Sequence, residues 1–166
     1  MEPITDESTP KSENNQDIAD IISSSLDKEF NQTYAGAYSS KDLQCLAEAV
    51  YYEARGEGNE GGIAVAEVVL NRTKSKRFPS TICGVVYDKY RNICQFSFAC
   101  NGSMSKPKNR SSWSWAKNIA NKVVEGRTEI LSDGALFFHA DYVNPSWANK
   151  MVKTARIGTH SFYRHR

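Results

Sequence analysis

Long hydrophobic runs are missing from this chain of 166 residues. Nowhere do about 18 apolar residues follow one another, so no segment is predicted to cross a membrane. Residues 1–16 are acidic and polar, and they lack the basic stretch followed by an apolar core that marks a secretory signal peptide. No signal peptide is therefore visible, while the 40% hydrophobic content is enough for a buried core.

Metal-binding spacing is missing too. No two cysteines form a C-x-x-C pair, and His139 and His160 lie far apart in sequence, so no metal site is expected. The even count favours disulfides made in an oxidising compartment, although four reduced, buried thiols are the alternative. The four cysteines are Cys45, Cys83, Cys94 and Cys100. Three pairings are possible; the last two flank residues 95–99 and would close a short loop, which leaves Cys45 for Cys83.

The net charge of +2 hides an uneven distribution. Residues 1–40 hold eight acids and two bases, a net charge of −6, whereas the other 126 residues hold 19 bases and 11 acids, a net charge of +8. We therefore predict an acidic, largely disordered tail at 1–40 and a folded domain at 41–166. Apolar residues at helical spacing predict a short helix at 17–30, either docked on the domain or serving as a linker.

A basic domain suggests an anionic partner. Basic side chains cluster at 72–77 and again at 106–110. No zinc-finger spacing, RNP aromatics or basic heptads accompany them, so nucleic acid is not the expected partner. A solvated basic face is the alternative interpretation of both clusters.

Periodicity predicts a mainly helical α+β domain with a small antiparallel sheet. Ser39 or Ser40 is expected to cap the first helix, Gly56 to end it, and Ser111 or Ser112 to cap the third. Trp113 and Trp115 on the third helix belong either to the core or to a cleft. The expected helices are 41–55, 60–72 and 111–126, with a helical turn at 146–151 and a pair of strands at 134–139 and 159–163.

Glu53 lies at the end of the first predicted helix. At about 100° per residue, its side chain falls beside the apolar stripe, at the margin of the core. A partly desolvated carboxyl group there should have an elevated pKa, as a general acid needs near neutral pH. The alternative is that Glu53 and Arg55 are solvated helix-end residues. Glu48 is expected on the opposite face of the same helix, where Glu48→Gln should have almost no effect on activity.

Three ordered blocks of sequence share features with a known family. They read YYEARGEGNEGGIAVAEVVLNRTKSKRFPSTICGVVY (51–87), CQFSFAC (94–100) and ALFFHADYVNPSWANKMVKTARIGTHSFYRH (135–165). From about Leu43 to His165 the chain resembles the SleB/CwlJ-type cell wall hydrolase family, which includes spore cortex-lytic enzymes and related phage and bacterial enzymes. The resemblance implies a lysozyme-like, lytic-transglycosylase-like fold and cleavage of peptidoglycan between N-acetylmuramic acid and N-acetylglucosamine.

The resemblance also implies a mechanism with one carboxyl group and no metal or organic cofactor. Glu53 would protonate the glycosidic oxygen and then act as the base that draws the muramoyl C6 hydroxyl onto C1, giving a 1,6-anhydro end. One alternative is a muramidase that uses water and a second carboxylate, for which Glu57 is the candidate. We favour Glu57 or Arg55 instead as a structural partner that orients the loop. The other is a module that binds cell wall or nucleic acid without cutting.

Aromatic rings stack on sugar faces, and amide or hydroxyl groups read sugar substituents. Tyr51, Phe98 and Phe138 are expected near the substrate, although core packing is the alternative for each ring. The residues predicted to bind the glycan are Tyr52, Glu57, Gln95, Phe96, Ser97, His139, Tyr142 and Trp147. We expect a monomer acting on anionic peptidoglycan in the periplasm or at the cell wall, or a phage lysin released from the host cytoplasm. Either a leader has been removed, or the protein leaves the cytoplasm by another route.

Overall fold

The computed structural model describes residues 21, 24–25, 38–126 and 128–166. Of the tail predicted at 1–40, only residues 21, 24–25 and 38–40 are described, and Ser40 already belongs to the first described helix. The rest of the tail, with most of the helix predicted at 17–30, lies outside the described residues. The elements are α2 (Ser40–Ala54), α3 (Gly58–Lys74), α4 (Ile82–Val86), β1 (Lys89–Tyr90), β2 (Ile93–Cys94), η1 (Ser97–Ala99), η2 (Ser103–Ser105), α5 (Arg110–Val124), β3 (Phe137–Ala140), η3 (Ala148–Lys150), β4 (Val152–Ile157) and β5 (His160–Arg164). Among the described helices, none is long and apolar enough to cross a membrane.

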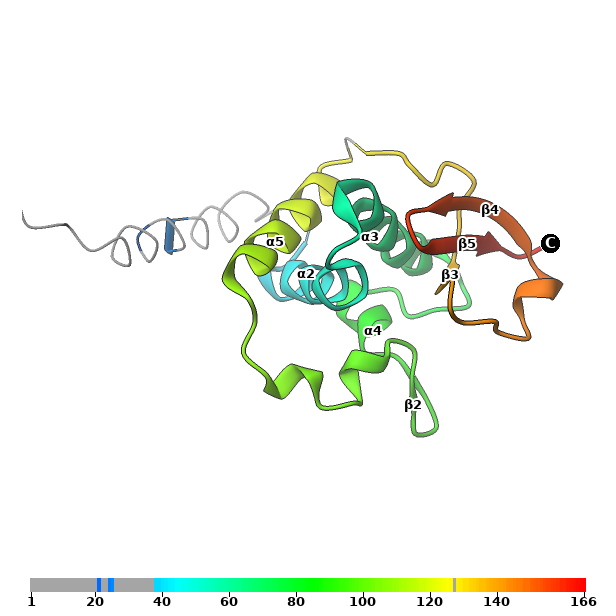
Figure 1. The fold of residues 1–166 in the computed structure, drawn as a ribbon, viewed down its shortest axis with the longest axis horizontal. Helices are drawn as coiled ribbons and strands as arrows, with labels where there is room; N and C mark the ends of the chain where they lie inside the picture. Colours follow the sequence, from blue (N-terminus) through cyan, green and yellow to red (C-terminus); the bar gives the residue numbers. More distant parts are fainter. Residues whose placement is uncertain (1–20, 22–23, 26–37, 127) are drawn as a thin grey trace, which may run out of the picture.

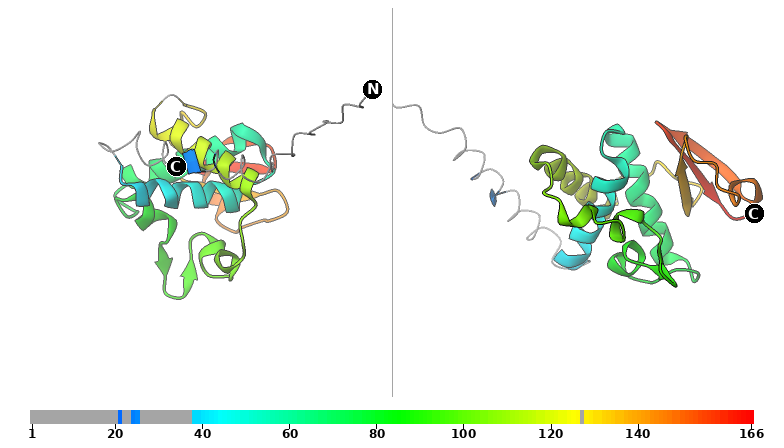
Figure 2. Two further views of the ribbon diagram at one scale, coloured as in Figure 1. Left: turned by 90° about the vertical axis from the view of Figure 1, so that its left-hand side faces the viewer. Right: turned by 60° about the horizontal axis from the view of Figure 1, so that its bottom comes forward.

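Helix α3 is the centre of the domain. It lies between α2 and α5 on one side and the three-stranded sheet on the other (Figures 1 and 2). Gly62 makes the close approach to α5 possible, because a Cβ atom there would lie 2.8 Å from Cζ2 of Trp115. The indole nitrogen of Trp115 donates to Oδ1 of Asn59 at 2.8 Å. Trp115 therefore belongs to the interface between the two helices rather than to a cleft.

Helix α2 forms where the sequence predicts it. The side chain of Ser39 accepts a hydrogen bond from the backbone of Asp42 at 3.0 Å and caps the first turn. The helix ends at Ala54, two residues before Gly56, whose positive φ of 94° suits glycine. Nine of its 15 residues are buried, which exceeds the single apolar stripe of an ordinary surface helix.

The other helices differ from the prediction in detail. Helix α3 extends two residues beyond the predicted range at each end. The cap of α5 is Asn109, whose side chain accepts from the backbone of Ser112 at 3.0 Å, so neither predicted serine is the cap. Helix α4 was not predicted, because five residues are too few to show a period.

The sheet has the order β3-β5-β4, with both pairs antiparallel. The predicted pairing of the last strand with the 134–139 segment is confirmed, and Phe138 lies opposite Phe162. Strand β4 was missed, because its burial does not alternate and a register shift interrupts it between Lys153 and Ala155. The sheet packs on α3 through a small core of its own, formed by Ala64, Val68, Leu131, Ala135 and Phe162.

Two disulfides cross-link the domain, as the sequence predicts. Cys45 of α2 pairs with Cys83 of α4, with Cα atoms 5.3 Å apart. Cys94 pairs with Cys100, with Cα atoms 6.0 Å apart, and closes the loop that leads from β2 through η1. The first bridge joins two helices of the core, and the second confines a loop.

Removing the bridge between the helices should destabilise the domain more than removing the loop bridge. The chain-entropy model gives about 3–4 kcal/mol for the Cys45–Cys83 separation of 38 residues and about 2 kcal/mol for the Cys94–Cys100 separation of six. Thermal melts of Cys45→Ala/Cys83→Ala and Cys94→Ala/Cys100→Ala should therefore rank in that order. Peptide mapping that found all four thiols alkylated without reduction would contradict both bridges.

Candidate active site

A cleft of about 500 Å³ runs between the helices and the sheet. Helix α2 contributes Tyr52 and Glu53 to its wall, α3 contributes Arg72 and β5 contributes His160. Residues within 94–103 and 138–143 complete the lining. Chain segments far apart in sequence therefore converge on the carboxyl group at the end of α2.

The carboxyl group of Glu53 is half-buried in the last turn of α2. Among the described residues, none donates a hydrogen bond to it. Desolvation raises the pKa of Glu53 from 4.5 to about 7, and the positive charge of Arg72 partly opposes this rise. Near neutral pH both the protonated and the ionised form of the Glu53 carboxyl group are therefore populated. The elevated pKa agrees with the expectation from the sequence.

Arg72 places a buried cation in the same cleft. Its side chain is only 5% exposed, and its Nε donates to the carbonyl oxygen of Leu136 at 2.8 Å. The guanidinium lies 4.8 Å from the ring centroid of Phe78 and 5.3 Å from that of Phe96. Burial lowers the pKa of Arg72 to about 10, and Asp88 and Glu53 oppose the shift, so the cation persists at neutral pH.

One nitrogen of this guanidinium stands out. Nη1 of Arg72 is buried and has no hydrogen-bond partner among the described residues. Nδ1 of His160, also in the cleft wall, is in the same situation. Buried polar atoms normally have partners, so both are groups that a bound molecule or water can satisfy. Burial lowers the pKa of His160, which keeps its imidazole neutral at neutral pH.

The structure brings six of the eight predicted glycan-binding residues into the cleft: Tyr52, Gln95, Phe96, Ser97, His139 and Tyr142. Tyr52 stacks on Phe98 with ring centroids 4.6 Å apart, and its hydroxyl reaches the carbonyl oxygen of Ser103 at 3.4 Å. Phe96 is buried in the floor, while Tyr142 is 90% exposed. The cleft thus combines an apolar floor, polar side chains and an exposed aromatic ring.

Glu57 does not lie in this cleft. Its carboxylate accepts hydrogen bonds from the backbone nitrogen of Thr159 at 3.0 Å and from the Thr159 hydroxyl. These bonds lower the pKa of Glu57. Gly158 has a φ of +57°, and a Cβ there would collide with the same carboxylate. Glu57 therefore ties the loop between α2 and α3 to the turn between β4 and β5.

Trp147 also lies outside the cleft lining. Its ring packs against Phe137, His139 and Tyr163, with centroids 5.7, 5.7 and 5.3 Å away. His139 itself has both ring nitrogens occupied, by the carbonyl oxygen of Ala140 and the hydroxyl of Tyr163, each at 2.9 Å. With Nδ1–H donating to the carbonyl oxygen, Nε2 accepts from Tyr163. His139 is therefore a wall residue held in a fixed orientation.

The structure decides two expectations about α2. Tyr51 is 2% exposed, and its hydroxyl accepts from the backbone nitrogen of Asn109 at 2.9 Å, so core packing, the alternative given for this ring, is the one that holds. The expectation for Glu48 is wrong. Glu48 is 5% exposed and accepts a hydrogen bond from the Tyr87 hydroxyl. The unpredicted helix α4 and the segment after it cover the face of α2 that was expected to be in solvent, so Glu48 is no silent control.

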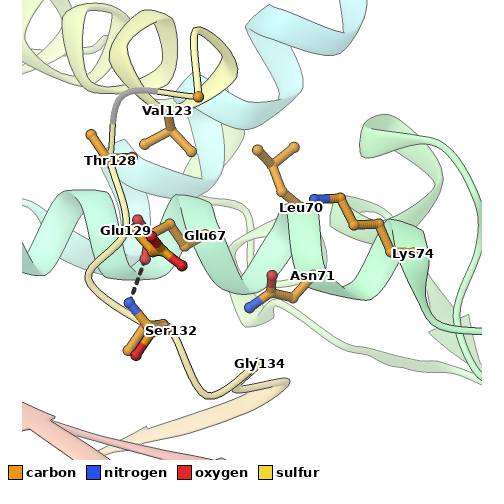
Figure 3. Close-up of a pocket in the computed structure, with 11 residues that line it drawn as sticks. Glu67, Leu70, Asn71, Lys74, Val123, Thr128, Glu129, Ser132 and Gly134 are labelled. Atoms are coloured by element: carbon orange, nitrogen blue, oxygen red, sulfur yellow. Dashed lines mark hydrogen bonds between the residues drawn. The ribbon is translucent and has the colours of Figure 1, made fainter.

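A second pocket of about 340 Å³ shares no lining residue with the cleft (Figure 3). Of its two carboxylates, Glu67 and Glu129, the first is buried and accepts from the backbone nitrogens of Ile130 and Leu131 at 2.9 and 2.7 Å. Asn71 similarly donates to the carbonyl oxygen of Ala135 at 3.0 Å. These contacts hold the loop after α5 and are structural. In the described part of the chain, no three His, Cys, Asp or Glu side chains are grouped to hold a metal.

Arg72, His160, Asn101 and Ser103 are cleft residues that sequence reasoning missed. Arg72 was assigned only to a basic cluster, because charge patterning does not reveal which cation of a run turns inward. His160 begins a strand whose first four residues are all buried. Alternation would have placed only half of them in the interior.

A family model described as Cell Wall Hydrolase matches residues 56–163, a range that begins three residues after Glu53. The spore cortex-lytic enzyme of Bacillus subtilis (strain 168) is 31% identical over 127 residues, covering 76% of this chain and 39% of that protein. The Bacillus cereus enzyme of the same description is 31% identical over 125 residues, covering 75% and 45%. The chain thus spans less than half the length of the curated relatives it matches.

Solved structures are similar over most of the described domain. The catalytic domain of the germination-specific lytic transglycosylase SleB from Bacillus anthracis gives a TM-score of 0.64 at 32% identity, covering 78% of this chain and 98% of that one. The catalytic domain of the Bacillus cereus SleB protein gives 0.59 at 29% identity, covering 80% and 97%. The lysozyme-like fold expected from the sequence is thereby confirmed.

The elevated pKa of Glu53 has a consequence for stability. The folded state binds more protons than the unfolded state between pH 4.5 and about 7, so this group's contribution to stability falls as pH rises through that window. Glu53→Gln removes the buried negative charge. It should raise the free energy of unfolding on the order of 1–3 kcal/mol at pH 8 and leave it nearly unchanged at pH 4.5.

Denaturant titrations at the two pH values measure this difference. Glu60→Gln makes the same chemical change at an exposed position in the first turn of α3 and should give no pH-dependent gain. A Glu53→Gln protein that is no more stable at pH 8 than the parent would mean that the carboxyl group is not desolvated.

Proposed function

This chain belongs to the Cell Wall Hydrolase family, and from that premise we propose that it cleaves peptidoglycan glycan strands as a lytic transglycosylase. One observation carries the proposal. Glu53 is the only carboxylate among the described residues that line the cleft. A hydrolase of the usual kind needs two carboxylates that flank the scissile bond, whereas an intramolecular transfer needs one group that acts first as acid and then as base.

In the proposed reaction, protonated Glu53 gives its proton to the oxygen that links N-acetylmuramic acid to N-acetylglucosamine. The bond from the muramoyl C1 to that oxygen breaks. The resulting Glu53 carboxylate takes the proton of the muramoyl C6 hydroxyl as this oxygen bonds to C1. The product carries a 1,6-anhydro ring, no water is consumed, and Glu53 ends protonated as it began.

Arg72 supports both halves of this cycle. A carboxyl group that must donate and then accept a proton works best with a pKa near the working pH. Desolvation alone would hold Glu53 in its acid form, and the buried Arg72 cation limits that effect. The same cation stabilises the carboxylate that exists between the two proton transfers, because attraction between charges is strong in a poorly solvated cleft.

The cleft wall supplies the remaining parts. Tyr52 and Phe138 offer ring surface to sugar faces, and Gln95, Ser97 and Asn101 offer amide and hydroxyl groups to sugar substituents. Substrate binding by these side chains is part of the proposal. The place of action is then the cell wall, which an extracytoplasmic enzyme or a released lysin would both reach.

The muramidase alternative has less support. Glu57, its candidate second carboxylate, lies outside the cleft lining and has both oxygens engaged by Thr159. A module that binds without cutting has no use for a half-buried carboxyl group with a pKa near 7. The carboxyl group of Glu53 therefore favours an enzyme over a binding module.

Glu53→Gln should abolish cleavage of purified sacculi, because it removes the transferable proton while keeping the shape of the side chain. General acid–base groups contribute about 10²–10⁴-fold in rate. Mass spectrometry of the parent digest should show muropeptides with anhydro ends, lighter by one water than reducing ends. Reducing ends would instead indicate a hydrolase.

Two matched variants complete this test. Glu60→Gln should cut at the parent rate. Glu57→Gln should keep anhydro products and lose mainly thermal stability, because it loosens the tether to Thr159. A folded Glu53→Gln protein with more than about a tenth of the parent rate would remove Glu53 from the mechanism.

The rate should depend on pH through the acid form of Glu53. With a pKa of about 7, kcat/KM should be high below that pH and fall above it. Arg72→Met removes the cation that lowers this pKa, so the falling limb should move upward by about one pH unit while the plateau rate drops. The measurement is a pH–rate profile on soluble glycan strands.

Phe78→Leu is the control for this shift. It disturbs the packing around the guanidinium but leaves the charge in place, so the limb should stay where it is. If Arg72→Met does not fold well enough for kinetics, Arg72→Lys replaces it as the conservative change. Carboxyl-carbon NMR then measures the pKa of Glu53 in the parent, Arg72→Lys and Phe78→Leu proteins. An unmoved limb in folded Arg72→Met would show that Arg72 acts only through packing.

A further inference from the structure

Four exposed cations meet beside the sheet; we call them the basic face, which consists of Arg77, Lys150, Arg164 and Arg166. The guanidinium of Arg77, just beyond α3, lies 3.0 Å from Nε2 of His165. Arg164 donates to the carbonyl oxygen of His165 at 3.0 Å, and Arg166 donates to that of Lys150 at 3.3 Å. Arg77 thus meets the C-terminal segment at the imidazole of His165, and Arg166 links that segment to Lys150.

These charges are not neutralised by the fold. Within the described residues, no side-chain carboxylate forms an ion pair with the basic face. The ion pair between Arg156 and Asp141, at 2.7 Å, includes none of its four residues. Burial and the charge of Arg77 both lower the pKa of His165, so that ring stays neutral at neutral pH. Like charges held together repel, and such a surface attracts an anionic partner.

Aromatic rings connect the basic face to the cleft. The ring of His165 lies 5.1 Å from that of Phe137, which lies 5.7 Å from Trp147. Trp147 in turn lies 5.7 Å from His139, and His139 is part of the cleft wall. Three ring contacts thus connect the imidazole that Arg77 contacts with the wall of the cleft.

We propose that the basic face, with Trp147 beside it, binds the carboxylates of the stem peptides that branch from the glycan strand. The proposal rests on the proposed function, and it names a second part of the same substrate. The sugars that flank the scissile bond offer hydroxyl and acetamido groups, whereas the free carboxylates of peptidoglycan belong to its peptides. The cleft would then bind the sugars, and the basic face beside it would bind the peptide carboxylates.

The test variant is Arg77→Gln/Lys150→Gln in the full chain. Its matched control, Lys41→Gln/Lys122→Gln, removes the same charge from exposed positions on α2 and α5. The substrates are sacculi stripped of covalently attached anionic polymers, and glycan strands freed of peptides, with the lactyl carboxyl groups that this exposes capped as amides. The test variant should need about three- to tenfold more peptide-bearing substrate for half-maximal rate at low salt, with kcat unchanged. The difference should fade as salt screens the charges, and peptide-free strands should be cut as by the parent.

Binding is measured beside cleavage. Co-sedimentation of Glu53→Gln proteins, with and without the Arg77→Gln/Lys150→Gln changes, with the stripped sacculi measures binding by the basic face without any cleavage. If the parent protein cuts neither substrate, the proposed function is refuted, and this binding measurement still tests the basic face. Equal loss on both substrates, or equal loss in the control, would overturn the proposal. A loss seen only with sacculi that keep their phosphate polymers would assign the surface to phosphate instead.

Discussion

Holding a carboxyl group half out of water at the end of a buried helix is the constraint on which the rest of this structure depends. Desolvation raises the pKa of Glu53 to about 7, so the folded state loses stability as pH rises from 4.5 to about 7 and carries the full cost above that. Core packing must exceed this cost. Helix α2 accordingly buries nine of its 15 residues and is cross-linked to α4 by Cys45 and Cys83. The burial and the cross-link of this helix thus offset the cost of the desolvated carboxyl group that it carries.

Two contacts between helix and sheet set the shape of the cleft. Arg72 reaches from α3 to the carbonyl oxygen of Leu136 just before β3, and Glu57 reaches from the start of α3 to Thr159 in the turn before β5. The first also places a cation beside the acid, and the second keeps the other carboxylate occupied. The cleft therefore has one free carboxyl group for two reasons: Glu53 lies in its wall, and Glu57 is held outside it by Thr159.

Local chemistry explains which predictions succeeded. Ser39, the apolar repeat of α2 and Gly56 are signals within one segment, so the helix and the margin position of Glu53 could be read directly. The pairing of β3 with β5 was also predicted. Strand β4 and helix α4 were missed, because a bulged edge strand and a single turn and a half carry no clear period. Because α4 was not predicted, Glu48 was expected to be exposed to solvent.

The sequence by itself determined the helix that carries Glu53, the two cysteine pairs and most of the cleft residues, because periodicity, caps and short loops are encoded over a few neighbouring positions. Only the tertiary structure decided that Arg72 turns inward, that Glu57 is tied to Thr159, that Glu48 is buried, and that Trp147 lies beside a basic face. Each of these depends on which distant segment covers a given side chain. That is set by the packing of helices against the sheet and not by the order of residues along one element.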